Sequence, residues 1–94
     1  MNFDNKVVMI TGAARGLGQE YARQFAARGA SVVVSDVRDC TETRTVIESE
    51  GAKSLAFRMD VTNANSVRKV VEAAVEEFGG IDILVNNAAL YGSL

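Results

Sequence analysis

The sequence contains no histidine, no proline and no tryptophan, and its only cysteine is Cys40. The absence of histidine excludes histidine base catalysis and, with a single cysteine, the Cys/His type of metal site. Cys40 has no partner for an internal disulfide and no flanking cluster of positive charge to lower its pKa, so we expect an inert residue at a helix start. No metal site is predicted.

The chain also lacks an excess of either charge and any long apolar run. Its 10 basic and 12 acidic residues are interspersed along 94 positions, which leaves no basic stripe for nucleic-acid phosphates. The apolar runs have the length of strands and are too short to span a bilayer, and the amino end lacks the pattern of a secretion signal. We therefore expect a cytoplasmic protein that binds neither nucleic acid nor membrane.

Four segments have the apolar patterns of strands. Three are apolar runs rich in β-branched residues, which are typical of parallel strands covered on both faces. In the fourth, Leu55, Phe57 and Met59 alternate with smaller or more polar residues, which favours the edge of a sheet. The three runs are Val7–Ile10, Val32–Val34 and Ile81–Val85.

Three segments between these strands have helical spacing. The first runs from Leu17 to a stop at Gly29, the second from Cys40 to Glu50, and the third, capped by Thr62 or Asn63, ends at Gly79-Gly80. The residues expected to face inward are Leu17, Tyr21, Ala22, Phe25 and Ala26 in the first helix, Val46 and Ile47 in the second, and Val67, Val70, Val71, Ala74, Val75 and Phe78 in the third.

The order βαβαβαβ with short connections predicts an α/β fold of the Rossmann type, with three layers α/β/α. Right-handed crossovers give a parallel sheet of four strands in the order 3-2-1-4, with two helices on one face and the third helix on the other. The fourth strand would then be an exposed edge, and one helix cannot cover a whole face. We therefore expect residues 1–94 to be part of one domain that is incomplete, truncated after the fourth strand.

A glycine-rich turn joins the first strand to the first helix, with the spacing G-x-x-x-G-x-G from Gly12 through Gly16 to Gly18. Free N–H groups and the positive end of the helix dipole stabilise a pyrophosphate where no Cβ blocks its approach. We expect Gly12 to make the tight turn, Gly16 to admit the phosphates and Gly18 to let the helix pack closely on the sheet. Taken alone, three glycines are also compatible with a sharp turn that binds nothing.

Asp36 stands at the carboxyl end of the second predicted strand. A carboxylate there can accept hydrogen bonds from the ribose hydroxyls of an adenosine and would repel the 2′-phosphate of NADP, so it favours NAD. Arg15 and Arg38 keep NADP open, because a basic residue at either place can pair with a 2′-phosphate. Each of the three residues is also compatible with a solvated surface charge.

Three motifs together resemble those of the short-chain dehydrogenase/reductase family. Thr11–Gly18 resembles its glycine motif, Asp60-Val61 its adenine-pocket pair, and Asn86–Ala89 its N-N-A-G motif, with Ala89 where the family usually has glycine. The resemblance covers essentially the whole chain. It identifies residues 1–94 as the dinucleotide-binding half of a single domain of this family.

The resemblance implies roles for residues outside the glycine turn. Asp60 would meet the adenine edge, Val61 would line the adenine pocket, Asn87 and Ala88 would lie beside the nicotinamide-side ribose, and Asn86 would stabilise the sheet. The residues that we assign to a nicotinamide dinucleotide are Gly12, Arg15, Gly16, Leu17, Gly18, Asp36, Asp60, Val61, Asn87 and Ala88.

The catalytic residues that the resemblance implies are a Tyr-x-x-x-Lys pair, a serine and an asparagine, all placed after the N-N-A-G segment. The tyrosine would act as acid/base and the lysine would lower its pKa. Phe25 stands four residues after Tyr21, and the sequence ends three residues after Tyr91. No catalytic residue is therefore predicted, and we expect the 94-residue chain alone to be inactive.

The leading hypothesis is that these residues form the front half of an NAD(P)-dependent oxidoreductase that interconverts a small alcohol and a carbonyl and works as a homo-oligomer. One alternative is a non-catalytic dinucleotide-binding module. Another is a fragment that does not fold alone and has no activity of its own.

Overall fold

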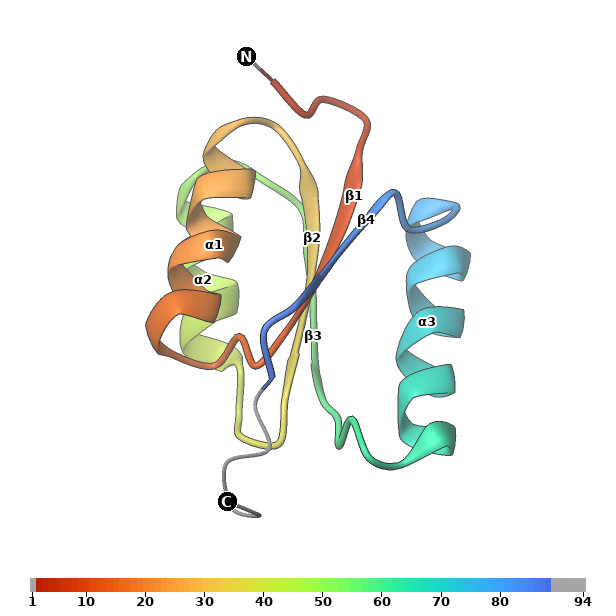
Figure 1. Cartoon of the computed structure of the whole chain (residues 1–94). Coiled ribbons are helices and arrows are strands. Elements are labelled where there is room, and N and C mark those ends of the chain that lie inside the picture. Colours follow the sequence, from red (N-terminus) through yellow and green to blue (C-terminus); the bar gives the residue numbers. More distant parts are fainter. Residues whose placement is uncertain (1, 89–94) are drawn as a thin grey trace.

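The computed structural model describes residues 2–88, which form a four-stranded parallel sheet between two layers of helices (Figure 1). Its strands pair in the order β3-β2-β1-β4, and every pair is parallel. The Rossmann-type fold and the strand order expected from the sequence are thus confirmed. The elements are β1 (Val7–Thr11), α1 (Gly16–Ala27), β2 (Ser31–Asp36), α2 (Thr41–Ser49), β3 (Ser54–Arg58), α3 (Ala64–Phe78) and β4 (Ile83–Asn86).

The core lies on both faces of the two central strands, because β-branched residues of β1 and β2 point alternately to either side. Val8, Ile10 and Val34 pack under α1 and α2, whereas Met9 and Val33 pack under α3. Figure 1 shows α1 and α2 together on one side of the sheet and α3 alone on the other. Both faces of β1 and β2 are therefore covered, as their continuous apolar runs predict.

Three predicted inward-facing residues are exposed instead. Leu17 is 65% exposed and Tyr21 38% exposed on α1, and Val75 on α3 is 49% exposed. In α1 the buried positions are Gly18, Ala22 and Ala26. Small residues at this spacing let the helix backbone approach the sheet closely, and the bulky residues at the edges of the stripe are turned outward.

The helix ends agree with the sequence patterns, with small shifts. Asn63, and not Thr62, caps α3, because its side chain accepts a hydrogen bond from the Ser66 N–H at 3.1 Å. Gly79 ends α3 in the left-handed conformation, with φ of 87°. Cys40 precedes α2 as its N-cap. No helix within residues 2–88 is long and apolar enough to cross a bilayer.

Candidate cofactor-binding site

The glycine turn, Asp36 and Asn87-Ala88 come together at the carboxyl edge of the sheet. The turn follows β1, Asp36 ends β2, and Asn87 follows β4, so the parallel arrangement of these three strands places all of them at one edge. This edge lies at the lower end of the sheet in Figure 1. Clefts beyond the carboxyl ends of parallel strands are the usual binding places of open α/β sheets.

Gly12 and Gly16 both have positive φ values, of 65° and 61°, which L side chains rarely adopt. They differ in their surroundings. A Cβ on Gly12 would lie 2.9 Å from the Ala88 Cα, so the turn and the segment after β4 are in backbone contact. A Cβ on Gly16 would meet nothing within 4 Å. The turn is therefore tightly packed at Gly12 and open at Gly16, where a ligand has room to approach.

Gly18 lies where α1 presses against the turn. A Cβ there would collide with the Gly12 carbonyl oxygen and would lie 2.8 Å from the Asn87 Nδ2. That same amide donates a hydrogen bond of 3.1 Å to the Gly12 oxygen. Only glycine at this position lets helix, turn and Asn87 approach so closely.

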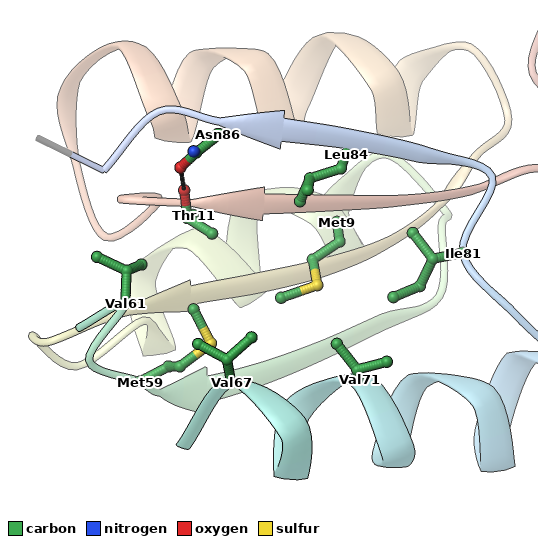
Figure 2. Close-up of a pocket in the computed structure, with 9 residues that line it drawn as sticks. All are labelled: Met9, Thr11, Met59, Val61, Val67, Val71, Ile81, Leu84 and Asn86. Carbon is green, nitrogen blue, oxygen red and sulfur yellow. Dashed lines mark hydrogen bonds between the residues drawn. The ribbon is translucent and has the colours of Figure 1, made fainter. Parts of the chain in front are cut away.

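The Thr11 hydroxyl ties the end of β1 to the segment after β4. It donates to the Asn86 Oδ1 at 3.1 Å and accepts the N–H groups of Asn87 and Ala88, both at 3.0 Å. The bond to Asn86 is the dashed line in Figure 2. One donor and two acceptor lone pairs are all that a hydroxyl offers, so Thr11 is fully used in holding these two strand ends together.

The amino end of α1 has no side-chain cap. Arg15 is the N-cap residue, its side chain makes no capping hydrogen bond, and the first turn contains no acidic residue. A helix start leaves its first N–H groups without intrahelical partners and carries a partial positive charge. Together with the open space at Gly16, this end fits an anionic ligand such as a pyrophosphate.

The carboxylate of Asp36 is held by two backbone groups. Its Oδ2 accepts the Ala14 N–H and its Oδ1 accepts the Arg38 N–H, each at 3.0 Å. An ionised carboxylate has about four acceptor positions, so each oxygen keeps one for a ligand hydroxyl. The side chains of Arg15 and Arg38 are exposed.

Two polar residues that the sequence patterns missed also hold the glycine turn. The Thr43 hydroxyl, fully buried on α2, donates to the Ala13 carbonyl at 2.6 Å. The Gln19 Nε2 donates to the Ala14 carbonyl at 3.2 Å and to the Thr43 hydroxyl at 3.0 Å. A search for apolar stripes passes over polar side chains, although Thr43 lies four residues before Ile47 and so shares its inward face.

Asp60 caps its own turn. Its Oδ1 accepts the N–H of Thr62 at 2.9 Å and the hydroxyl of Thr62 at 2.6 Å, and these hydrogen bonds lower the pKa of Asp60 below its ordinary value. The carboxylate is therefore ionised near neutral pH. Its contact with an adenine stays a prediction.

Val61 lines an apolar pocket of about 250 Å³ between α3 and the sheet. Figure 2 shows Val61 at the end of the pocket nearest the Thr11–Asn86 hydrogen bond, with Ile81 at the far end. Leu84 of β4 lines the same pocket and is 61% exposed. The assignment of Val61 to an adenine pocket likewise stays a prediction.

Cys40 is buried, and its thiol is protonated near neutral pH. Burial, followed by the nearby charges of Asp36 and Asp39, raises the pKa of Cys40 to about 11. A thiol that is neither exposed nor ionised is unreactive.

Within residues 2–88 no group of three His, Cys, Asp or Glu residues is placed to hold a metal. Ala89 and Tyr91 lie outside the described residues.

Residues 6–93 match the short chain dehydrogenase family, and the chain belongs to this family, as its motifs indicate. It is 48% identical over 91 residues to galactitol 2-dehydrogenase of Agrobacterium fabrum, an alignment that covers 97% of this chain and 35% of that protein.

Two solved structures are similar to the whole described fold. A hydroxysteroid dehydrogenase from Escherichia coli gives a TM-score of 0.89 at 39% identity, with 94% of this chain and 38% of the other covered. A carveol dehydrogenase from Mycobacterium avium, solved in complex with NAD, gives 0.89 at 26% identity, with 94% and 37% covered. The chain thus spans little more than a third of the length of these relatives.

Proposed function

We propose that the protein to which this chain belongs is a nicotinamide-dependent oxidoreductase that interconverts a small alcohol and a carbonyl, and that residues 1–94 bind its dinucleotide. Membership of the short chain dehydrogenase family supports this proposal. The observation that carries it is the uncapped start of α1, open at Gly16, beside a carboxylate that retains free acceptor positions.

In this proposal, the first turn of α1 binds the pyrophosphate through its free N–H groups. Asp36 accepts hydrogen bonds from the adenosine ribose, while Asn87 and Ala88, fixed by Gly12 and Thr11, bound the nicotinamide side. The bound cofactor would supply hydride transfer. The residues of this chain bind and orient it, and proton transfer would fall to residues beyond this chain. The homo-oligomeric state and the cytoplasmic location stay predictions.

We further propose that NAD is preferred over NADP. The Asp36 carboxylate is held in place by two backbone N–H groups, so it cannot swing away from a 2′-phosphate without giving up both. A phosphate brought against this fixed negative charge is repelled, whereas free hydroxyls are good donors to it. Arg15 and Arg38, both exposed, lose little by remaining solvated.

The test is titration of the purified full-length protein with NADH and NADPH. The wild type should bind NADH at least about tenfold more tightly than NADPH, a difference of roughly 1.4 kcal/mol. Asp36→Ala should lower the affinity for NADH and bring the ratio of the two affinities closer to one. Asp39→Ala is the matched control, because it removes the same charge from an exposed position three residues away and should leave the ratio unchanged. Tighter binding of NADPH than of NADH by the wild type would overturn the preference for NAD.

A further inference from the structure

Two side chains, Thr43 of α2 and Gln19 of α1, hold the carbonyl groups of Ala13 and Ala14 in the glycine turn. Thr43 binds the Ala13 oxygen at 2.6 Å, and Gln19 binds the Ala14 oxygen at 3.2 Å. The two side chains also bind each other, because the Gln19 Nε2 donates to the Thr43 hydroxyl at 3.0 Å. One connected network therefore fixes two consecutive carbonyl groups of the glycine turn.

Fixing a carbonyl also fixes the N–H group that follows it. The peptide group is planar and trans, so its C=O and N–H point in opposite directions. The Ala13 oxygen points to Thr43, and the Ala14 N–H accordingly points to the Asp36 carboxylate, 3.0 Å away. By the same rule, the Ala14 oxygen directed at Gln19 turns the N–H of Arg15 away from this network.

Carbonyl orientation matters at an anion site. An oxygen turned toward a bound phosphate would repel it, whereas N–H groups attract it. The Ala13 oxygen is occupied by Thr43 of α2 and the Ala14 oxygen by Gln19 of α1. The turn thus presents donors rather than acceptors beside the uncapped start of α1.

Water cannot replace the Thr43 hydroxyl as the donor to the Ala13 oxygen. The side chain of Thr43 is fully buried, as is Ala13. Removing the hydroxyl would leave the Ala13 oxygen without this partner in a place that water does not reach. It would also remove one of the two acceptors of Gln19. A buried polar group left unsatisfied is costly, and a small rotation of the peptide toward solvent would relieve it.

We propose that Thr43 and Gln19 are positioning residues for the dinucleotide, which hold the carbonyl groups of Ala13 and Ala14 away from its phosphates. This inference rests on the proposed dinucleotide site. It gives α2, which would contribute no atom to that site, control over the affinity for the pyrophosphate. A purely structural tie between α1 and α2 is the competing explanation, and it predicts no discrimination between ligands with and without phosphates.

The experiment compares NADH, ADP and adenosine on the full-length protein, with ADP and adenosine measured by displacement of NADH fluorescence. Thr43→Val keeps the shape of the side chain and removes the hydroxyl. It should lower the affinity for NADH and for ADP by about tenfold and change the affinity for adenosine by less than about twofold. Thr43→Ser restores the hydroxyl and should bind like the wild type. Thr45→Val is the matched control, because Thr45 is exposed on the same helix and bonds only within it.

Two results would overturn the inference. The first is a Thr43→Val variant that binds ADP as tightly as the wild type does. The second is a Thr43→Val variant whose affinities for ADP and for adenosine fall by the same factor. If Thr43→Val does not fold, Gln19→Leu replaces it as the test, because Gln19 is only half-buried. This variant should show the same selective loss of affinity for ADP. A wild type that does not bind NADH at all would instead overturn the proposed function.

Discussion

Gly18 is the position where one added methyl group has most to disturb. Its Cβ would meet the Gly12 oxygen and the Asn87 amide, although alanine is the better helix former by about 1 kcal/mol. Because the obstacle is backbone, which cannot move aside as a flexible side chain can, we expect Gly18→Ala to lower the free energy of unfolding by roughly 1–3 kcal/mol and to weaken NADH binding. Urea denaturation and NADH titration of the full-length protein measure the two effects.

Gly51→Ala is the control for that substitution. Gly51 has φ of 82° with nothing within 4 Å of an added Cβ, so alanine there costs only backbone strain, about 1 kcal/mol. It follows α2 at the opposite edge of the sheet from the glycine turn and should leave NADH affinity unchanged. Equal NADH affinity for Gly18→Ala and the wild type would contradict the proposed role of Gly18.

Residues that act through the backbone were the most predictable from the sequence. The spacing of Gly12, Gly16 and Gly18 after an apolar strand indicates a turn at a helix start, because few other residues tolerate such φ values or contacts. Thr43 and Gln19 were missed for the opposite reason. Threonine and glutamine are common on helix surfaces, and only the fold reveals that Thr43 bonds the glycine turn and that Gln19 of α1 bonds Thr43 of α2.

At the level of the elements, the amino end of α3 offers a test of local stability. The Asn63 side chain accepts the Ser66 N–H, and loss of an N-cap of this kind costs about 1 kcal/mol. Asn63→Ala should lower the free energy of unfolding by that amount and leave NADH affinity nearly unchanged. Asn65→Ala, an exposed substitution inside the same first turn, should change stability by less than about 0.5 kcal/mol. Equal stability of the two variants would contradict the capping role.

The existence and type of every element could be predicted, whereas the exact face of two helices could not. Periodicity finds an apolar stripe but not its centre. In α1 the stripe is centred on Ala22 and Ala26, which pack closely, and Leu17 and Tyr21 lie at its exposed margin. In α3 it is centred on Val70 and Ala74, which leaves Val75 half exposed. Such offsets depend on distances between layers, and the sequence does not specify those.

For the whole molecule, residues 2–88 form the proposed binding edge, and no tyrosine among them follows a strand at that edge. Tyr21 is the only tyrosine among residues 2–88, and it lies on the outer side of α1. We therefore expect a polypeptide of residues 1–94 to convert no alcohol in the presence of NAD, as followed by nicotinamide absorbance. The full-length protein, assayed with the same set of alcohols, is the control. Turnover by the purified 94-residue polypeptide would contradict this division of labour.

Because of the hydrogen bonds of Thr11, we expect the proposed site to form late in folding. Its partner Asn86 lies 75 positions away in sequence, so the chain must close a loop of that length before the strand ends can meet. Contacts of such high sequence separation slow folding and form only as most of the native structure assembles. A ligand that requires both strand ends binds only after this closure, and by mass action it then opposes the detachment of β4 from β1. Protection of the β4 amides against hydrogen exchange should thus rise with cofactor concentration. The bound dinucleotide would then stabilise the pairing of β4 with β1.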